Sequence, residues 1–271
     1  MNLLPRFSIG IIFLVAITLL PTILFKYAQS EPLPHPRLIA HAGGSVNGLR
    51  YTNSREALET SYAEGFRWFE LDLEVTSDGE LVLLHDWDYI LRNHFGVAPG
   101  VRSLAEFKTL GNGIPYTTLS VAELADWLTT HPDVYLITDI KKGRLRRLVK
   151  LRREFPRVAK RIVPQIYTFW HYLPVRLLGF SPPILTLYAN NYSEARVLRF
   201  AKRAPLWAVT LPAERALESE LPKQLQQRGI ITYAHLVDTP ELARRLRSRG
   251  VFGFYTALLS SLDEETTVIG D

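Results

Sequence analysis

The chain has 271 residues, of which 47% are hydrophobic and 22% are charged, and its formal net charge is +5. This composition is typical of a globular protein, excludes a low-complexity chain, and at this length suits one large domain. There is no cysteine, which excludes disulfides and thiolate metal sites, so a metal ion would need carboxylate, carbonyl or imidazole ligands.

Residues 1–30 predict a membrane segment. Nineteen residues without a formal charge, FSIGIIFLVAITLLPTILF, follow Arg6. This run has the length of about one bilayer crossing and exceeds the roughly 7 to 15 apolar residues of a usual signal peptide. We therefore expect an uncleaved anchor with the rest of the chain outside the cytoplasm. A cleaved signal peptide, which would leave a secreted protein, is the alternative. A Pro-rich linker follows at 31–36.

From residue 37 onward, short β-prone runs alternate with amphipathic segments. Eight strands are expected, at 37–41, 68–75, 134–140, 161–167, 184–189, 206–211, 230–234 and 252–256. Strands that alternate with helices predict βα units, and eight such units fit a closed barrel. No glycine-rich dinucleotide turn follows the first strand, which argues against an open Rossmann-type sheet. We expect an α/β fold, a (β/α)₈ TIM barrel over 37–258, with an N-terminal transmembrane or signal-anchor helix and a tail at 259–271.

Capping signals mark several helices between these strands. Asn53 or Ser54 can cap the segment REALETSYAEG, and SVAE at 120–123 is a capping box. In DTPELARRLRSRG, Pro240 falls near the first helical position. The segment 86–115 is too long for a plain connection, so we predict an insertion that covers the mouth of the barrel.

Polar side chains gather at the ends of the predicted strands. Glu70 and Asp72 lie two residues apart on the second strand and therefore face the same side. The other members of the group end or follow strands and are His41, His85, Asp139, Lys141 and Gln165. Active sites of these barrels lie at the carboxyl ends of the strands. One end of the barrel is therefore expected to hold three carboxylates, two histidines and a lysine.

The three carboxylates predict a metal site. Two neighbouring acids in a barrel interior repel each other and lose hydration, and a divalent cation removes both penalties. Glu70, Asp72 and Asp139 offer an all-oxygen ligand set, which favours Mg²⁺ or Ca²⁺ over Zn²⁺. The alternative is that Glu70 pairs with Lys141 and Asp72 is solvated.

His41 and His85 suggest paired proton transfer beside the metal. One imidazole would take a proton from the nucleophile and the other would give one to the leaving oxygen. Cleavage of a phosphodiester requires such a pair, together with positive charge near the non-bridging oxygens. Lys141 and the metal would supply that charge, and the backbone amides of Gly43 and Gly44 could approach the phosphate.

Five segments carry a resemblance to a known family. They are HAGG (41–44), YTNSREAL (51–58), FELDLEVTSDGELVLLHD (69–86), YLITDIK (135–141) and PQIY (164–167). In this order they resemble the His-Arg-Gly, Glu-Asn-Thr, Glu-x-Asp with T-x-D-G and His-Asp, Glu-x-Lys, and glutamine motifs of the glycerophosphodiester phosphodiesterases. The resemblance covers roughly residues 36–258.

The resemblance implies a (β/α)₈ barrel and a divalent metal held by Glu70, Asp72 and Asp139. It also implies acid and base roles for His41 and His85. The implied substrates are glycerophosphodiesters or lysophospholipids, which would yield an alcohol and glycerol 3-phosphate or a cyclic phosphate.

The sequence departs from the family pattern at three positions. Ala42 stands where the family has arginine, and Thr52 stands where it has glutamate. Arg50 could restore the lost positive charge by reaching in from its loop. Asp139 replaces the glutamate of most members, which resembles the sphingomyelinase D branch of the same superfamily, although the carboxy-terminal motif of that branch is missing.

The candidate substrate-binding residues are Gly43, Arg50, Asn53, Gln165, Trp87 and His235. Trp87 lies near a strand end and could line a glycerol or alkyl subsite, with packing as the alternative. His235 follows the seventh strand and could face the pocket. The basic run at 143–161 is an exposed helix face or a contact with anionic lipid headgroups. Because no nucleic-acid-binding module accompanies this charge, we expect no nucleic-acid partner.

The sequence thus predicts a metal-dependent phosphodiesterase that acts on small-molecule or lipid phosphodiesters. His41 would act as base on water or on a neighbouring hydroxyl of the substrate, and His85 would act as acid. Two alternatives stay open. One is a lipid transphosphatidylase similar to sphingomyelinase D or phospholipase D. The other is a membrane-tethered, non-catalytic module that binds phospholipid headgroups and lost efficient chemistry through Ala42.

Overall fold

The computed structural model describes residues 33–259. The membrane segment predicted at 1–30 and nearly all of the tail predicted at 259–271 lie outside these residues. Among residues 33–259, no helix combines the length and the apolar character needed to cross a bilayer.

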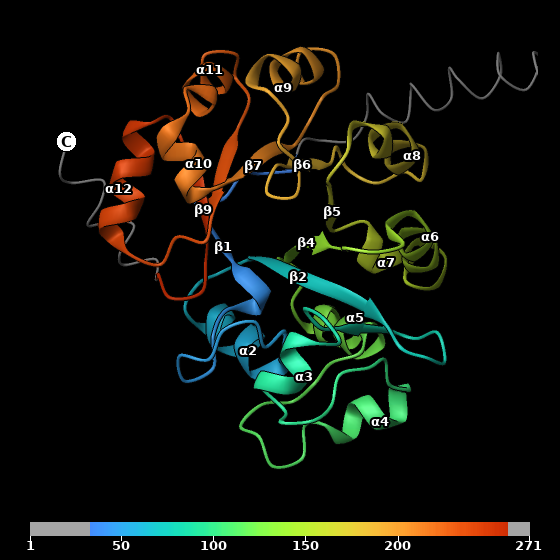
Figure 1. Cartoon of the computed structure of the whole chain (residues 1–271). Coiled ribbons are helices and arrows are strands. Elements are labelled where there is room, and N and C mark those ends of the chain that lie inside the picture. Colours follow the sequence, from blue (N-terminus) through green and yellow to red (C-terminus); the bar gives the residue numbers. More distant parts are fainter. Residues whose placement is uncertain (1–32, 260–271) are drawn as a thin grey trace, which may run out of the picture. The chain divides into compact units, whose positions relative to one another are not determined.

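Eight parallel strands close into a barrel, which confirms the predicted architecture (Figure 1). β1 pairs with β2 on one side and with β9 on the other, so the first and last strands complete the ring. The barrel strands are β1 (Leu38–Ala40), β2 (Trp68–Val75), β4 (Tyr135–Asp139), β5 (Ile162–Ile166), β6 (Ile184–Thr186), β7 (Ala208–Pro212), β8 (Thr232–His235) and β9 (Gly253–Thr256).

Helices surround the barrel on its outside (Figure 1). Those that follow barrel strands are α2 (Arg55–Ala63), α5 (Val121–Thr130), α6 (Arg144–Glu154), α7 (Pro156–Ala159), α8 (Tyr172–Leu177), α9 (Glu194–Ala201), α10 (Ala213–Glu218), α11 (Leu221–Gln226) and α12 (Pro240–Ser248). Two 3-10 helices, η1 (His41–Gly43) and η2 (Phe169–His171), follow β1 and β5. The apolar inner faces of the surrounding α-helices pack with the strands in one continuous core.

The capping signals act where the sequence predicts them. The Ser54 hydroxyl accepts a hydrogen bond from the Ala57 N–H at the start of α2. Ser120 and Glu123 form a reciprocal capping box on α5. Pro240 occupies the first position of α12, where its missing N–H leaves no helical bond unmade.

β2 extends beyond the barrel and carries a hairpin. Its carboxyl half pairs antiparallel with β3 (Leu81–Leu83), with Leu73 opposite Leu83. In the turn, the Thr76 hydroxyl donates to Asp78 at 2.5 Å and accepts from the Glu80 N–H at 2.8 Å. Gly79 has a φ of +90°, a conformation that favours glycine. This turn returns the chain so that His85 follows β3 beside the end of the barrel.

The segment 86–115, predicted as an insertion, contains α3 (Tyr89–Asn93) and α4 (Leu104–Thr109). These short helices pack over an apolar cluster separate from the main core, formed by Val82, Leu84, Trp87, Ile90, Leu91 and Phe107.

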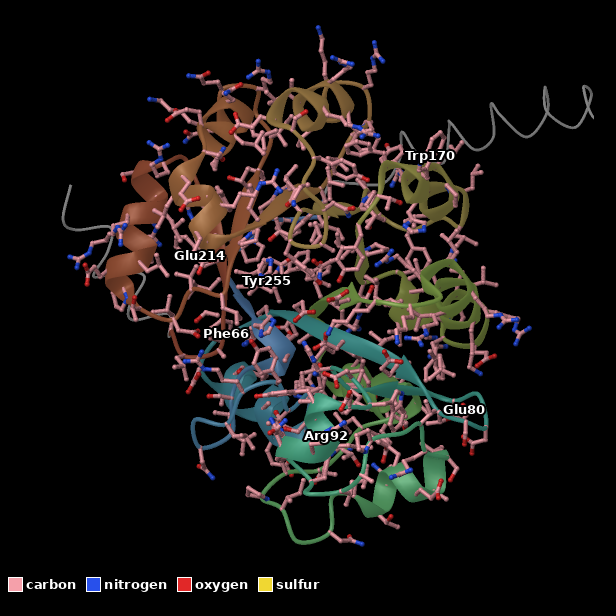
Figure 2. All side chains as sticks on the ribbon, in the orientation of Figure 1. Phe66, Glu80, Arg92, Trp170, Glu214 and Tyr255 are labelled. Atoms are coloured by element: carbon pink, nitrogen blue, oxygen red, sulfur yellow. The ribbon has the colours of Figure 1, made fainter. Side chains whose placement is uncertain are left out.

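Aromatic rings fill the amino end of the barrel. Trp68 stacks on Tyr135 with ring centroids 4.8 Å apart and on Trp207 at 4.9 Å, and Trp207 stacks on Tyr233 at 5.5 Å. Trp68 lies on the same side of β2 as Glu70 and Asp72, because alternate residues of a strand share a face. Tyr255, near the carboxyl end of β9, is also buried inside the barrel (Figure 2). The aromatic stack thus occupies the amino end of the barrel interior, and the polar side chains of β2, Glu70 and Asp72, lie nearer its carboxyl end.

Candidate active site

A cavity of about 180 Å³ lies among the carboxyl ends of the barrel strands. The predicted site residues that line it are His41, Glu70, Asp72, His85, Asp139, Lys141, Gln165 and His235. A larger hollow of about 510 Å³ lies outside the barrel, beside α5 and α7, and none of the predicted site residues lines it. We therefore place the chemistry in the barrel cavity.

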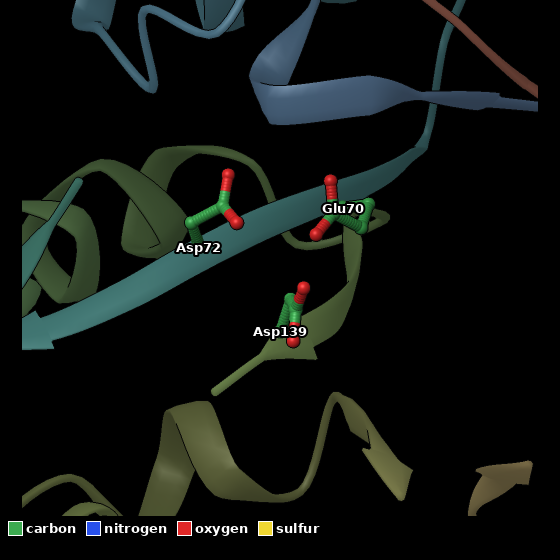
Figure 3. Close-up of side chains that lie close together, drawn as sticks. All are labelled: Glu70, Asp72 and Asp139. Atoms are coloured by element: carbon green, nitrogen blue, oxygen red, sulfur yellow. The ribbon is translucent and has the colours of Figure 1, made fainter. Parts of the chain in front are cut away.

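Three buried carboxylates converge in this cavity. Glu70 and Asp72 project from β2 and Asp139 projects from β4, toward a shared space (Figure 3). Asp72 and Asp139 are direct partners in the parallel pairing of the two strands. Within residues 33–259, one oxygen from each of the three acids can be chosen so that all lie within 4.8 Å of one another. Strand register therefore creates the cluster that the sequence predicted.

The protonation equilibria of the three acids show a shortage of positive charge. Burial, reinforced by Asp72 and Asp139, raises the pKa of Glu70 well above its ordinary value. Burial and the charge of Asp72 raise the pKa of Asp139. Burial also opposes ionisation of Asp72, but Lys141, the two histidines and the hydrogen bond from Asn53 together outweigh it and lower the pKa of Asp72. One lysine does not balance three buried acids, so the donor set fits a divalent cation.

Neighbouring groups fix each carboxylate in place. The Asn53 amide donates to Asp72 Oδ2 at 3.0 Å, and its carbonyl accepts from the Asp72 N–H at 3.0 Å. The Ala42 N–H donates to Glu70 Oε2 at 3.1 Å. The hydroxyls of Tyr167 and Tyr188 both bond to Asp139, that of Tyr188 at 2.5 Å. Such bonds orient the ligand oxygens of metal sites.

The two predicted catalytic histidines have different surroundings. The His41 side chain is only 13% exposed, and its Nε2 lies 3.7 Å from Glu70 Oε2. Burial lowers the pKa of His41 to about 4, so the imidazole is neutral at neutral pH. His85 is partly exposed, and its Nδ1 lies 2.6 Å from Asp86 Oδ2. The Tyr51 ring contacts both imidazoles, with centroids 5.2 and 5.1 Å away.

Lys141 connects the acids to the hairpin. Its ammonium donates to Asp72 Oδ1 at 3.2 Å and to the His85 carbonyl at 3.0 Å. Burial favours the neutral amine, but the charges of Asp72 and Asp139 outweigh this effect and raise the pKa of Lys141, which stays protonated. The alternative in which Lys141 pairs with Glu70 is wrong, because its carboxylate partner is Asp72.

Four of the predicted substrate-binding residues lie outside the cavity lining. Arg50 forms an ion pair with Asp238 at 2.8 Å, so its charge is already neutralised. The Trp87 ring is buried against Phe107, with centroids 5.7 Å apart, because the indole completes the apolar cluster under α3 and α4.

The two others have supporting positions. Asn53 acts on Asp72, as described above. Gly43 has a φ of +82°, and a Cβ built there would lie 3.5 Å from side-chain atoms of Ala57 and Leu58 on α2. A Cβ on the next residue, Gly44, would lie 2.1 Å from the Ser61 hydroxyl. These glycines therefore allow the sharp turn after β1 and its close approach to α2.

Three tyrosines line the cavity without having been predicted: Tyr51, Tyr188 and Tyr255. Tyr188 follows β6 directly after Leu187, so its place at a strand end was a signal in the sequence. Burial raises the pKa of Tyr188, and the charge of Asp139 raises it further, so the phenol remains a hydrogen-bond donor.

The sequence of the chain matches one protein family. The model of the glycerophosphoryl diester phosphodiesterase family matches residues 41–257. No curated protein sequence matches the chain significantly.

Several solved structures share the fold. A glycerophosphodiester phosphodiesterase from Thermotoga maritima has 20% identity and a TM-score of 0.67, covering 87% of this chain and 99% of that one. One from Parabacteroides distasonis has 19% identity and a TM-score of 0.66, with coverages of 86% and 97%. A phosphodiesterase from Oleispira antarctica, in complex with the product sn-glycerol-3-phosphate, has 15% identity and a TM-score of 0.64, with coverages of 87% and 97%.

Identities this low establish the fold alone, whereas the family match covers most of the chain and includes the buried acids and both histidines. The chain therefore belongs to the glycerophosphoryl diester phosphodiesterase family and is a phosphoric diester hydrolase.

Proposed function

We propose that the chain cleaves glycerophosphodiesters, including lysophospholipids, to an alcohol and either glycerol phosphate, when water attacks the phosphorus, or a cyclic phosphate, when the substrate's neighbouring hydroxyl does. One observation carries this proposal: three buried carboxylates within 4.8 Å share a cavity with His41, His85 and Lys141. The product in the Oleispira antarctica structure, sn-glycerol-3-phosphate, supports the assignment of the glycerol phosphate half of the substrate.

Glu70, Asp72 and Asp139 would hold the cofactor, a Mg²⁺ or Ca²⁺ ion, because all their donors are hard carboxylate oxygens. When bound, such an ion would offset the negative charge that develops on the non-bridging phosphate oxygens. Lys141 is protonated and lies beside Asp72, so it adds a second positive charge to the same wall of the cavity.

The two histidines suit opposite halves of a proton transfer. His41 is neutral at neutral pH, so it can accept a proton from water or from the substrate's neighbouring hydroxyl. His85 has Asp86 at its Nδ1, which leaves Nε2 to protonate the departing alkoxide oxygen. The Asp86 carboxylate would orient this imidazole, as carboxylates beside catalytic histidines do.

The size of the cavity limits what it can enclose. Pockets for drug-sized ligands have volumes of about 300 to 1,000 Å³. The barrel cavity, at about 180 Å³, can enclose only a small group. We infer that it encloses the glycerol phosphate part of the substrate and that the alcohol part, including any acyl chain, extends outward.

Turnover of glycerophosphocholine and lysophosphatidylcholine, with Mg²⁺, Ca²⁺ or chelator, would test the proposal. Phosphorus NMR of the products separates hydrolysis from intramolecular transfer, which gives a cyclic phosphate. Glu70→Ala should abolish turnover, whereas Glu80→Gln, at an acid on the hairpin that lies outside the cavity, should retain it. Equal rates for wild type and Glu70→Ala would refute the metal role.

We also propose, from the apolar run after Arg6, that residues 1–30 anchor the chain in a membrane with the barrel on the extracytoplasmic side. Membrane fractionation of the full chain, followed by protease added from either side, would test both statements. Recovery of uncleaved full-length chain in the soluble fraction would contradict the anchor.

A further inference from the structure

An apolar face stands exposed on η2 and α8. Trp170, Leu173 and Leu177 are 84%, 61% and 54% exposed. Their spacing of three and four residues places them along one side of the helical segment. We call these three residues the α8 face. Figure 2 shows Trp170 on the outer surface beside α8. The four other tryptophans of the chain are at most 9% exposed, so the exposure of Trp170 is specific to this position.

The opposite side of the same segment is firmly packed. The Phe169 ring stacks on Tyr192 with centroids 4.4 Å apart and on Phe200 of α9 at 4.3 Å. Val175 of α8 is completely buried. Because the segment already has its apolar contacts with the barrel, the α8 face is additional apolar surface that remains in water. Exposed apolar surface bordered by polar residues is a common mark of an interaction site.

Two arginines of the neighbouring helices lie near the two ends of the segment that carries the α8 face. At the start of the segment, Arg196 of α9 lies 5.4 Å from the centroid of the Phe169 ring and 4.8 Å from that of Tyr192, on the side that packs against α9. At the other end, Arg152 of α6 extends to Gly179, and its Nη2 lies 3.6 Å from the position of a Cβ built there. None of the ion pairs found within residues 33–259 includes Arg152 or Arg196. Figure 1 shows α8 between α6 and α9. Positive charge with no acidic partner thus borders the apolar residues.

We propose that the α8 face binds the surface of an anionic phospholipid bilayer. Tryptophan and leucine favour the boundary between headgroups and acyl chains, where an indole keeps its N–H in contact with polar groups. Arg152 and Arg196 would contact the lipid phosphates, whose negative charge complements theirs. The binding is separate from hydrolysis, because none of these five residues lines the catalytic cavity.

The position of the face in the fold gives this binding a use. η2 begins at Phe169, directly after Tyr167 and Thr168, at the end of β5 where Gln165 lines the cavity. A bilayer seated on the α8 face would therefore lie beside the end of the barrel at which the substrate enters. A membrane anchor at residues 1–30 would hold the barrel near the bilayer and raise the effective concentration for this contact.

The buried state of the other tryptophans makes the contact measurable. The full chain would be reconstituted into phosphatidylcholine vesicles with or without phosphatidylglycerol, using acyl chains brominated near the headgroup as quenchers. We expect quenching of tryptophan fluorescence when phosphatidylglycerol is present and its loss at high salt. Trp170→Phe should remove the quenched component of the fluorescence, which would assign that component to Trp170. The double variant Arg152→Gln with Arg196→Gln should lower the equilibrium constant for binding of the α8 face to the bilayer surface by about tenfold or more, the effect of losing two surface cations.

A matched control uses another exposed apolar residue. Val101, between α3 and α4, is 51% exposed. Val101→Glu should leave quenching unchanged, whereas Leu173→Glu with Leu177→Glu should remove it while circular dichroism and turnover of soluble glycerophosphocholine stay unchanged. Quenching that survives the double leucine substitution, or that Val101→Glu removes equally, would overturn the proposal. Protection of Trp170 from iodide without lipid, increasing with protein concentration, would assign the face to a second copy of the chain and also overturn it.

Discussion

Glu70 has the least favourable electrostatic position of the three cavity acids. Its pKa is raised mainly by burial and then by Asp72 and Asp139, and the Ala42 N–H is its only hydrogen-bond donor among the described residues. Glu74, two positions further along the same strand, is instead paired with Arg147 at 2.9 Å. Two buried acids of one strand therefore have opposite effects on the free energy of unfolding.

Glu70→Gln should stabilise the metal-free protein while lowering turnover by about a hundredfold or more. The amide keeps the acceptor oxygen for Ala42 and removes the repulsion. We expect Tm in EDTA to rise by about 2–4 °C, the shift that about 1 kcal/mol produces in a domain of this size. Differential scanning calorimetry checks this, and Glu74→Gln, which breaks a buried ion pair, should lower Tm instead.

The same substitution has a defined pH dependence. Because the folded pKa of Glu70 lies above its ordinary value of 4.5, the folded state binds the proton more tightly than the unfolded state. The penalty of ionised Glu70 therefore grows as the pH rises above that ordinary value. The stability difference between Glu70→Gln and wild type should vanish in acid. A difference that stays constant with pH would contradict this electrostatic origin.

Asp139 depends on phenol donors that follow β5 and β6, Tyr167 and Tyr188. The bond from Tyr188, at 2.5 Å, favours the charged carboxylate and orients it toward Glu70 and Asp72. Tyr188→Phe should raise the pKa of Asp139 and weaken metal affinity by about 10- to 100-fold, the usual effect of removing such a bond. Metal titration of turnover measures this. Tyr192→Phe, whose ring stacks on Phe169 away from the cavity, should leave metal affinity unchanged.

At this scale the acids and histidines were predicted, but the tyrosines were not. Glu70 and Asp72 share a face because they are two residues apart on one strand, which the sequence shows directly. Tyr167 and Tyr188 are 28 and 49 residues from Asp139, and only the order of the strands brings them together. Trp87 was wrongly placed near substrate, because a buried and a pocket-lining indole look alike in sequence.

Among the elements, α5 shows where local sequence signals suffice to predict a helix, and α8 shows where they do not. The boundary of α5 was readable from its capping box, in which Ser120 and Glu123 bond to each other's backbone N–H. No helix was predicted at α8, since Pro174 lies within it and its exposed Leu173 and Leu177 break the amphipathic pattern. The proline is tolerated in the first turn, where its N–H would have no helical partner.

Ser120→Ala should lower the free energy of unfolding by about 1 kcal/mol, the usual cost of losing an N-cap. Urea unfolding followed by circular dichroism measures the change. Ser248→Ala, at an exposed serine near the end of α12 whose hydroxyl bonds to the Arg245 carbonyl, is the control and should have a smaller effect. Turnover should be unaffected in both variants, since neither serine lines the cavity. Equal destabilisation would show that the capping box contributes little to α5.

At the scale of the whole molecule, the carboxylate cluster links two adjacent strands of the barrel. β2 contributes Glu70 and Asp72 and β4 contributes Asp139, and these strands pair over five registered positions from Trp68 to Asp72. Two of the three acids have raised pKa values, so the protein without metal contains stored repulsion in its centre. Metal binding should therefore stabilise the entire barrel cooperatively.

Removing the metal with EDTA should lower Tm relative to protein with excess Mg²⁺ or Ca²⁺. A ligand at about 100 times its Kd stabilises a folded protein by about 2.7 kcal/mol. In a domain of this size that equals roughly 5–10 °C. Differential scanning fluorimetry across metal concentrations measures the shift, and Asp72→Asn should reduce it. A Tm independent of divalent metal would contradict a resident ion at this site.

The closure of the barrel at β1 has a mechanical consequence. The Pro36 carbonyl accepts from the Tyr233 hydroxyl at 2.8 Å, and the Arg37 carbonyl accepts from the Phe254 N–H at 2.8 Å. Tension arriving through the preceding chain thus enters at the strand that completes the ring. There it pulls along parallel strands, so several hydrogen bonds share the load in shear instead of opening one after another. A pulling force applied at this end of the barrel would therefore act where the paired strands β1 and β9 resist sliding past each other.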